Sequence, residues 1–492
     1  MTIREMTDLI SFDPANDSVV ATFPVMGEAD VAAAVDSARG ASSWWQDQGF
    51  PGRAAHLRRW RRHIWAHVDE IADLIKRENG KHRDDAVLEV VLTVEHIRWA
   101  ERNAARTLAS RRVRPGLLLA NFAATVDHVP LGVVGIISPW NYPLYAPNSS
   151  VSFALAAGNA VLLKPSEYTP AVAAWYVEAF HSANPDSPRG VLQLVTGAGE
   201  TGAALCRSGV DKIGFTGSTR TGTRVMAACA ETLTPLHLEC GGKDPVIVAA
   251  DAEVTAAARA VAWGAFTNAG QTCVGVERVY VVDAVREAFL EALEAELRGV
   301  RPGADPAATY GPMTMPAQVE VVRRHVAEAA EAGARFLVGG PESVGDRFIA
   351  PVVILDPPED CAAVREETFG PTVTVTTVAD EDEAIALANA STYALSASVF
   401  SAGHGQDIAR RLRAGQVTVN SVIAFAGMGA VPMGGRGASG FGRVHGAEGL
   451  KEFAVPRGVV TQRFALPGFE LISLHRARHL LPVLRRVVGL RH

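Results

Sequence analysis

The chain has 492 residues, of which 48% are hydrophobic and 20% charged, with a formal net charge of -6 and a pI near 6.2. This composition is typical of a globular protein with large buried cores, and the length predicts two to four folding units. The mildly acidic balance gives no general attraction to nucleic acid. We therefore expect no nucleic-acid partner.

The N-terminal segment and the cysteines bear on the compartment. The first twenty residues carry scattered charges and lack the apolar core of a secretory signal. No run of about 18 uncharged apolar residues predicts a membrane span. The five cysteines are an odd number without CxxC spacing, which is typical of reduced thiols and predicts no metal site. These features favour a cytoplasmic protein.

The chain to about residue 110 has helical periodicity. Apolar residues recur at three-and-four spacing over residues 28–41 and 53–79, and Gly80 follows as a helix stop. Residues 117–129 alternate apolar with small or polar residues, which predicts an exposed hairpin.

From Gly132 on, short β-rich runs alternate with Ala-rich helical stretches. This alternation predicts an α/β fold whose parallel sheets bind ligands at the carboxyl ends of their strands. In the first series we expect strands at 133–137, 160–163, 192–195, 212–215 and 245–248, and helices at 151–157, 170–179, 201–208 and 221–230. In the second series, from 251 to about 420, we expect strands at 278–282, 336–338, 372–378, 396–400 and 416–420, and helices at 254–267, 284–297, 317–332 and 381–390.

Cys273 lies in the segment Asn-Ala-Gly-Gln-Thr-Cys-Val-Gly, directly after a helical run. A thiol on such a turn is accessible to a substrate, and a nearby helix N-terminus would lower its pKa. A lone cysteine is nevertheless more often a small core residue. The residue by itself therefore leaves both interpretations open.

Two further polar residues follow apolar strands. Glu239 precedes Gly241 and Gly242, and burial would raise the pKa of its carboxyl toward the range of a general base. A helix cap or an ion pair with Lys243 is the commoner role for such a residue. Asn141 could donate to a developing oxyanion, although an Asx-type turn explains it equally well.

Two strand ends could contact a dinucleotide. Lys164 and Glu167 follow one strand, and a carboxylate there can accept hydrogen bonds from ribose hydroxyls and would repel a 2′-phosphate. A turn from Gly217 to Gly222 opens a helix and offers backbone N–H groups to a pyrophosphate. Its GxxxxG spacing is weak evidence, because glycine turns commonly serve only tight geometry.

Together these segments closely resemble the aldehyde dehydrogenase superfamily over about residues 10–465. Seven motifs carry the resemblance, in the family's order: PWNYP, GNAVLLKPSE, FTGSTRTG, LECGGKDP, NAGQTCVGVERVYV, EETFGP and PMGGRGASGFGR. The 34 positions from Glu239 to Cys273 also resemble the family's spacing between base and nucleophile. The resemblance implies an NAD(P)-dependent, hydrolytic aldehyde dehydrogenase.

The resemblance also implies a role for each matching residue. Cys273 would attack the aldehyde carbon, and the Asn141 amide and the Cys273 N–H would hold the thiohemiacetal oxyanion. Hydride transfer would leave a thioester, which Glu239 would hydrolyse through an activated water. The implied cofactor contacts are Lys164 and Glu167 at the adenosine ribose, Gly217 and Ser218 at the pyrophosphate, Glu367 at the nicotinamide ribose and Phe369 near the ring, with Ile137, Ser138, Trp140, Gly197 and Gly222 nearby.

By the same resemblance we expect a Rossmann-like cofactor domain, an α/β catalytic domain and a small β extension for oligomerisation. The expected boundaries are 1–115 and 131–240 for the cofactor domain, 241–440 for the catalytic domain, 116–130 and 455–466 for the oligomerisation strands, and 467–492 for a basic amphipathic tail. The extension predicts a homodimer or homotetramer. The tail could lie on an anionic membrane or cover the tunnel mouth, or it could dock on its own or a neighbouring subunit.

The substrate is less constrained than the reaction. Overall likeness favours actinobacterial succinate-semialdehyde-type enzymes, but the segment after Pro143 lacks the arginine that such enzymes often carry for the distal carboxylate. Cys240, Asp244 and Ala394 depart from the family pattern without removing a catalytic role. The predicted tunnel is roomy and largely apolar, with Tyr145, Phe266, Val274, Phe425 and Met433 as its residues.

This tunnel favours a medium-chain aliphatic or aromatic aldehyde, and Glu167 favours NAD over NADP. Three alternatives stay open. One is a succinate-semialdehyde dehydrogenase. A second is a CoA-acylating enzyme, which Glu239 disfavours because that class usually lacks the water-activating carboxylate. The third is a non-enzymatic binding or structural protein on the same scaffold.

Overall fold

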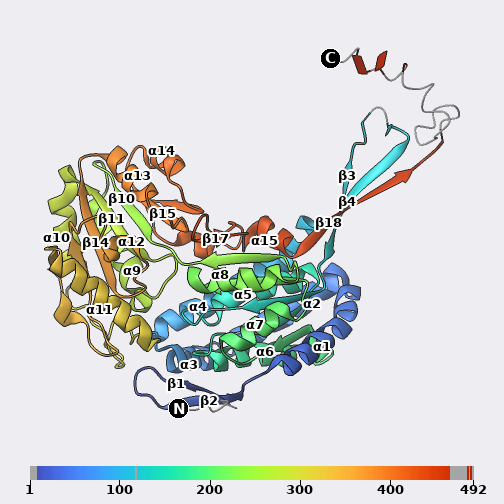
Figure 1. Cartoon of the computed structure of the whole chain (residues 1–492), viewed down its shortest axis with the longest axis horizontal. Helices are drawn as coiled ribbons and strands as arrows, with labels where there is room; N and C mark the ends of the chain where they lie inside the picture. The colour runs from blue at the N-terminus through green and yellow to red at the C-terminus, as the bar shows by residue number, and fades with distance from the viewer. Residues whose placement is uncertain (1–7, 117–118, 466–481, 483–484, 487, 490–492) are drawn as a thin grey trace.

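The computed structural model describes residues 8–116, 119–465, 482, 485, 486, 488 and 489. Two helix-covered sheets lie next to each other, and a three-stranded arm projects from one of them (Figure 1). The fold is α/β, as the sequence predicts. None of the described helices is long and apolar enough to cross a membrane.

The first sheet is six-stranded and parallel except at one edge. In spatial order its strands are β17 (Gly440–Phe441), β9 (Leu236–Cys240), β8 (Lys212–Gly217), β5 (Val133–Ile137), β6 (Ala160–Lys164) and β7 (Leu192–Leu194), with β17 antiparallel to β9. The helices around it are α1 (Glu28–Asp47), α2 (Gly49–Ala66), α3 (Val68–Asn79), α4 (Arg83–Thr107), α5 (Tyr145–Ala157), α6 (Pro170–Ala183), α7 (Gly199–Arg207) and α8 (Thr219–Ala230). We call this sheet with its helices the first lobe.

Two hydrophobic cores hold the first lobe together. Successive side chains of a strand point to opposite faces of a sheet. Val134 and Ile136 of β5 therefore pack against α5 and α6, with α2, α3 and α4 completing that core. Val133 and Ile137 pack against α1, α7 and α8 on the other face.

The second sheet is seven-stranded and parallel except for its first strand. In spatial order its strands are β12 (Arg335–Val338), β13 (Val352–Leu355), β14 (Thr372–Val378), β11 (Val276–Val282), β10 (Asp244–Val248), β15 (Ser396–Phe400) and β16 (Gln416–Val419). Its helices are α9 (Val254–Phe266), α10 (Arg286–Leu297), α11 (Pro316–Glu331), α12 (Ala362–Arg365), α13 (Glu381–Asn389) and α14 (Gly405–Arg411). Helices α9–α11 cover one face and α13 and α14 the other, and we call the whole the second lobe.

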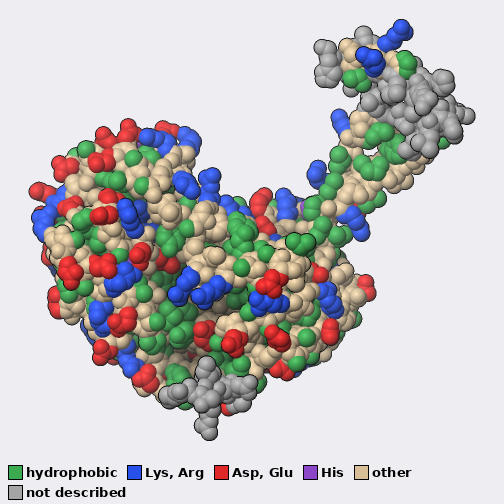
Figure 2. All heavy atoms as spheres, viewed as in Figure 1, with side chains coloured by type: hydrophobic (Ala, Val, Ile, Leu, Met, Phe, Trp, Pro, Cys, Tyr) green, Lys and Arg blue, Asp and Glu red, His purple; other side chains and the backbone are tan. Residues whose placement is uncertain are grey.

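The arm pairs distant parts of the chain. Its strands are β3 (Arg111–Val113), β4 (Phe122–Pro130) and β18 (Ala454–Gln462), in the antiparallel order β18-β4-β3. β18 follows α15 (Gly446–Glu452), which packs on α4 and α5. The arm carries hydrophobic side chains on its surface (Figure 2), among them Val455, Val459 and Val460.

Several elements differ from the sequence-based expectation. The run at 245–248 was expected in the first sheet. It forms β10, which lies between β11 and β15 of the second sheet, because the chain crosses between the lobes at Gly241 and Gly242. The expected helix at 53–79 is two helices, α2 and α3, which break at His67. Gly80 does end α3, in a left-handed conformation with φ of 87°.

Three further predictions concern the N-terminal segment, the arm and the C-terminal tail. The N-terminal hairpin of β1 (Asp8–Phe12) and β2 (Val19–Pro24) was not predicted. The exposed hairpin expected at 117–129 begins earlier, because its first strand is β3 at 111–113 and only β4 lies near the expected range; residues 117 and 118 lie outside the described part. Most of the predicted basic tail at 467–492 also lies outside the described residues.

Candidate active site

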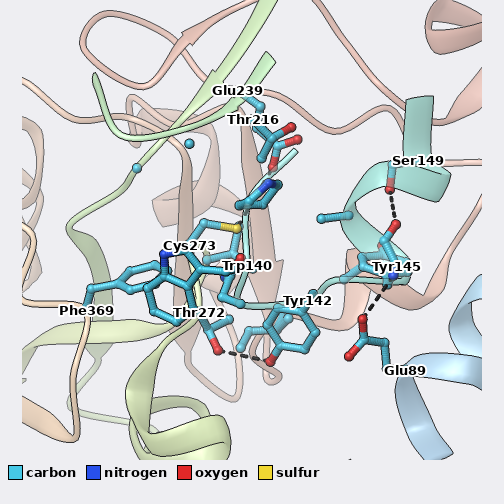
Figure 3. A pocket seen from close by; sticks show the side chains of 18 of the residues that line it. Glu89, Trp140, Tyr142, Tyr145, Ser149, Thr216, Glu239, Thr272, Cys273 and Phe369 are labelled. Atoms are coloured by element: carbon cyan, nitrogen blue, oxygen red, sulfur yellow. Dashed lines mark hydrogen bonds between the residues drawn. The ribbon is translucent and has the colours of Figure 1, made fainter. Parts of the chain in front are cut away.

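A cavity lies where the two lobes meet, and it is lined by residues from both. The sequence-predicted residues that it brings together are Trp140, Asn141, Tyr145, Gly217, Ser218, Glu239, Cys273, Val274, Glu367, Phe369 and Met433. Figure 3 shows several of them, with the sulfur of Cys273 in the middle of the group. Loops at the carboxyl ends of β5, β8 and β9 in the first sheet, which is the edge where open α/β sheets bind ligands, meet loops at the amino ends of β10, β11 and β14 in the second sheet. The expectation of ligand binding at carboxyl ends therefore fits the first sheet and not the second.

Cys273 reaches the cavity from a strained turn between α9 and β11. Asn268 and Ala269 have positive φ angles of 51° and 55°. The turn is held by its own side chains, because Gln271 Nε2 donates to Asn268 O at 2.9 Å and Asn268 Nδ2 donates to Gln271 O at 3.2 Å. At Gly270 a Cβ would collide with the main chain of Gly370, so this position requires glycine. Such over-determined strain is typical of functional sites.

Glu239 faces Cys273 from the end of β9. The Cys273 Sγ lies 4.0 Å from the Glu239 Oε1. Main-chain pairing holds Glu239 from both sides, with Thr216 of β8 and with Gly440 of β17. Burial raises the pKa of Glu239 to about 7, where a carboxyl group exchanges protons readily at neutral pH.

The cavity raises the pKa of the Cys273 thiol well above its usual value, first through burial and then through the charges of Glu239, Glu367 and Asp244. The prediction that a nearby helix N-terminus lowers this pKa is therefore wrong. The neighbouring groups are carboxylates, which disfavour a thiolate. Cys273 is consequently a thiol in this state and needs a base to attack.

Asn141 is tied to the segment that precedes Cys273. It lies in the loop after β5, and its Nδ2 donates to Gln271 O at 3.0 Å. The main-chain carbonyl oxygen of Asn141 accepts hydrogen bonds from Asn268 Nδ2 and from Lys81 Nζ, both at 3.0 Å. An amide NH2 has two hydrogens, so the second remains available to a ligand in the cavity.

A second chain of hydrogen bonds joins the lobes beside this loop. Gln271 Oε1 accepts from Thr314 N at 2.8 Å, and Thr314 Oγ1 donates to Asn79 O at 2.6 Å. Asn79 Nδ2 in turn donates to Trp140 O at 2.9 Å. Gln271, Thr314 and Asn79 are buried, so the nucleophile turn and the Asn141 loop are held together by polar contacts shielded from water.

A buried ion pair between Lys243 and Glu277 holds the opposite wall of the cavity. Glu277 accepts from Thr368 N at 2.9 Å and from Phe369 N at 3.0 Å. Phe369 has a φ of 51°, and its ring meets that of Trp140 edge to face with 5.5 Å between centroids. The pair therefore sets the conformation of the loop that carries Phe369.

Glu367, in the same loop, lies against the turn where the chain crosses between the lobes. Its Oε1 accepts from Gly242 N at 3.0 Å, and a Cβ at Gly241 would collide with its carboxylate. Burial, reinforced by the charge of Glu277, raises the pKa of Glu367 to about 8. Asp244 is similar, since burial raises its pKa to about 8 although Ser396 donates to it.

The remaining predicted cofactor residues lie along the carboxyl edge of the first sheet, outside the cavity lining. Ile137 and Lys164 end the neighbouring strands β5 and β6, and Ser138 N donates to Lys164 O at 3.0 Å. Glu167 follows on the same loop. Gly197 follows β7 with a φ of 147°, and Gly222 in α8 is packed against Cys240, where a Cβ would lie 2.9 Å from the sulfur.

This edge fits a dinucleotide by its chemistry. Gly217 ends β8, and a Cβ there would lie 2.8 Å from the Phe215 ring. Ser218 caps α8 by accepting from Thr221 N at 3.3 Å. A helix N-terminus after a glycine turn offers N–H groups to a pyrophosphate, and Lys164 and Glu167 supply one cation and one carboxylate at the end of β6, two strands along the same sheet.

The tunnel residues divide into two sets. Tyr145, Val274 and Met433 line the cavity, whereas Phe266 packs in the core of the second lobe and Phe425 packs behind the lining against Val274 and Met433. Sequence reasoning missed the apolar residues that line the cavity beside them: Leu88 and Leu92 of α4, Trp263 of α9, and Met315, Ile423 and Ala426.

The sequence does contain a signal for the part of the cavity lining that comes from α4. Asp85, Leu88, Glu89 and Leu92 all line the cavity, and their spacing places them on one helix face. Nothing in that spacing indicates which cavity the face meets. Among the described residues, no group of three or more His, Cys, Asp or Glu side chains is arranged to hold a metal ion.

Comparison with known proteins identifies relatives over nearly the whole chain. The model of the aldehyde dehydrogenase family matches residues 3–459. A "4,4'-diapolycopene aldehyde oxidase" of Methylomonas is 36% identical over 466 residues, covering 94% of this chain and 87% of the relative. A "Putative succinate-semialdehyde dehydrogenase" with NADP in its name, from Mycobacterium tuberculosis, is 38% identical over 95% of this chain and 92% of its own length.

The structure of an NAD-dependent aldehyde dehydrogenase from Sinorhizobium meliloti superposes with a TM-score of 0.89. The two chains are 33% identical, and the superposition covers 93% of this chain and 92% of the other.

Proposed function

This chain belongs to the aldehyde dehydrogenase family, and we propose that Cys273, Glu239 and Asn141 carry out its chemistry. Like its family, it is an NAD(P)-dependent oxidoreductase that acts on an aldehyde. The observation that carries the assignment of residues is the 4.0 Å approach of Cys273 Sγ to Glu239 Oε1, beside an asparagine amide tied to the same turn.

In this proposal Glu239 takes the thiol proton while the Cys273 sulfur bonds to the aldehyde carbon. The carbonyl oxygen becomes an oxyanion, to which the free Asn141 N–H donates. The cofactor, when bound, supplies the hydride acceptor. Glu239, after releasing its first proton, removes a proton from water as the water attacks the resulting thioester. The carbon–sulfur bond then breaks, the acid leaves and the Cys273 thiol is restored.

We further propose that Lys164, Glu167, Gly217, Ser218, Glu367 and Phe369 hold the dinucleotide, with Ile137, Ser138, Trp140, Gly197 and Gly222 shaping its site. The family uses NAD or NADP. We propose a preference for NAD, because the Glu167 carboxylate would repel a 2′-phosphate at the adenosine ribose. In this proposal residues 1–115 and 131–240 serve cofactor binding, and residues 241–440 carry the nucleophile.

The proposed substrate is a medium-chain aliphatic or aromatic aldehyde. The described lining of the cavity contains no lysine or arginine, whereas it contains the carboxyl groups of Asp85, Glu89, Glu239 and Glu367. A free carboxylate on the substrate would find no cation there, and burying an unpaired charge is unfavourable. The apolar side chains of the lining suit a hydrocarbon tail instead.

Succinate semialdehyde is the second candidate. It is favoured by the name of the mycobacterial relatives at 38% identity and disfavoured by the cation-free cavity. The name of the Methylomonas relative refers to a diapolycopene aldehyde and gives no support to succinate semialdehyde.

For the assembly we propose a homodimer or homotetramer formed through the arm. Most of β18 is exposed, and an exposed strand edge is a template for pairing with another chain. Its apolar side chains Val455, Val459 and Val460 would be covered in such an assembly. Light scattering on the full chain measures the oligomer size.

A panel of aldehydes with NAD and NADP tests the function. We expect NADH formation, fastest with uncharged aldehydes of six to twelve carbons (an approximate range set by the apolar lining). Addition of CoA should yield no acyl-CoA. Absence of NADH with every aldehyde, from protein that binds NAD normally, would contradict the enzymatic role. A preference for succinate semialdehyde would contradict the proposed substrate class.

Two variants test the residue roles. Cys273→Ser is expected to lose turnover but to bind the cofactor normally. Glu239→Gln is expected to lose the single-turnover formation of NADH as well as steady-state turnover, because a glutamine cannot take the proton of the Cys273 thiol, and mass spectrometry of the intact protein should show no acyl adduct on Cys273. Normal steady-state turnover in either variant would refute its assigned role.

A further inference from the structure

A second buried lysine–glutamate pair lies directly behind the Asn141 loop. Lys81 precedes α4 and Glu89 lies in it, and their side chains are 0% exposed, with 2.5 Å between Lys81 Nζ and Glu89 Oε2. A buried pair seldom stabilises a protein more than apolar side chains of the same volume would. Its presence at this place therefore calls for an explanation other than stability.

Both charged ends contact the main chain of one loop. Glu89 Oε1 accepts from Leu144 N at 2.8 Å and from Tyr145 N at 3.0 Å, so it caps the N-terminus of α5. Lys81 Nζ donates to Asn141 O at 3.0 Å and lies 3.8 Å from the centroid of the Tyr142 ring. The pair therefore holds residues 141–145 at both ends.

The same loop contacts the residues immediately before Cys273. Asn141 Nδ2 donates to Gln271 O at 3.0 Å. The Tyr142 hydroxyl lies 3.0 Å from Thr272 Oγ1, and Figure 3 shows this bond together with the one from Tyr145 to Glu89. A continuous set of buried contacts thus runs from α4 through the loop to the nucleophile.

We propose that Lys81 and Glu89 are positioning residues, which fix the main chain of residues 141–145 so that the Asn141 amide faces the oxyanion formed on Cys273. The inference rests on the proposed function, because it assigns the pair a part in that reaction. Lys81 acts on the carbonyl of Asn141 and Glu89 on the N–H groups at the far end of the loop. Lys81 is not among the residues that line the cavity, and the side chain of Glu89, although it borders the cavity, is 0% exposed, so in this proposal both act through the loop and not on the substrate.

The test is a double-mutant cycle between Lys81→Met and Asn141→Ala. For each variant, the steady-state kcat and the single-turnover rate of NADH formation are measured. Lys81→Met alone is expected to lower kcat about tenfold to a hundredfold, less than the full loss of an oxyanion donor. The KM for the aldehyde and the Kd for NAD should change by less than about twofold. In the Asn141→Ala background, the same substitution should lower kcat by less than about threefold, because its effect passes through Asn141.

Lys212→Met is the matched control. Lys212 also forms a largely buried pair, with 2.6 Å between its Nζ and Glu452 Oε2, but it lies at the amino end of β8, away from the cavity. This variant is expected to lower the melting temperature and leave kcat unchanged. It separates a general loss of stability from a loss of positioning.

Removal of one member of a buried pair can prevent folding. In that case the cycle is run with Lys81→Met/Glu89→Gln, which keeps the side-chain volumes and an oxygen for Leu144 N and Tyr145 N. The same non-additivity with Asn141→Ala is expected. Normal kcat in the single or double variant would overturn the proposal, as would an equal loss of kcat in both backgrounds. Failure of the proposed function is distinguishable, because wild-type protein would then produce no NADH.

Discussion

Each of the two walls of the cavity contains a buried lysine–glutamate pair, and the two pairs have different neighbours. In the first lobe Glu89, paired with Lys81, accepts from two consecutive N–H groups at residues 144 and 145. In the second lobe Glu277, paired with Lys243, accepts from two consecutive N–H groups at residues 368 and 369. Each pair holds a loop that borders Cys273.

The surroundings of the two pairs assign them to different tasks. The Lys81–Glu89 pair contacts the loop of Asn141, which we assign to the oxyanion. The Lys243–Glu277 pair lies near Glu367 and Asp244, whose pKa values burial raises to about 8, and burial lowers the pKa of Lys243 itself. The first wall should therefore set the rate of the chemical step, whereas the second should set cofactor binding and respond to pH.

The largest expected effect tests the first wall. Asn141→Ala should lower kcat by about a hundredfold to a thousandfold, the usual loss when one oxyanion donor is removed. The Kd for NAD, measured by fluorescence titration, should stay within about twofold of the wild-type value. A variant that loses cofactor affinity and keeps its kcat would reverse the assignment of the two walls.

The second prediction concerns pH and the second wall. The folded pKa of Glu367 is raised, so the folded protein keeps a proton that the unfolded chain releases. Its contribution to stability is therefore present below about pH 4.5 and is lost as pH rises toward about 8. Glu367→Gln should remove this loss, which amounts to about 1 kcal/mol per pH unit.

Melting temperatures from pH 5 to 8, without ligands, measure this effect as the difference between variant and wild type. Glu178→Gln is the control, because Glu178 pairs with Arg189 on the surface. It should leave the pH dependence over this range unchanged. A Glu367→Gln curve parallel to the wild-type curve would show that the second wall does not titrate in this range.

A third prediction separates the two pairs directly. The neutral variant Lys243→Met/Glu277→Gln should weaken NAD binding about tenfold, because the loop of Glu367 and Phe369 loses its anchor. Its kcat at saturating NAD should fall less than that of Lys81→Met. Titration with NAD followed by turnover at saturation measures both quantities. Unchanged NAD affinity would show that the two pairs are not specialised.

The smallest expected effect concerns the apolar part of the first wall and its neighbour α9. Leu88 and Trp263 line the cavity and are 43% and 46% exposed, so they form its rim. Trp263→Ala should lower kcat/KM about threefold to tenfold for an aldehyde with a long hydrocarbon tail and leave a short aldehyde unaffected. Trp65→Ala, an exposed tryptophan of α2, is the control. Equal losses for both chain lengths would remove the rim from the substrate site.

Local sequence predicted the parts of the site that lie within one segment. The turn before Cys273, the two prolines around Asn141 and the glycines after Glu239 are each readable without tertiary structure. The α/β fold follows from the alternation of strands and helices. The left-handed Gly80 at the end of α3 was likewise predictable, because a positive φ at a helix end favours glycine.

Features that depend on contacts between distant segments were not predictable from the sequence. Lys81 and Glu89 lie before and within α4, about 55 positions from the loop they hold. The pKa of Cys273 depends on its burial and on carboxyl groups from β9, from the loop before β14 and from β10. Phe266 was expected in the tunnel, but it packs in the core of the second lobe and Trp263 lines the cavity. The two side chains lie only about 60° apart around α9, so contacts with distant segments decide which of them meets the cavity.

The hydrogen-bond chain from Gln271 through Thr314 and Asn79 to Trp140 also constrains how this protein can change during evolution. The bond from Thr314 to Asn79 joins the two lobes, and the other two bonds each lie within one lobe. The side chains of Gln271, Thr314 and Asn79 are buried, where little water can replace a lost partner. A chimera that takes one lobe from a distant relative would have to match all of these partners at once. Recombination between the lobes is therefore disfavoured, and the two halves of the cavity are inherited as one unit.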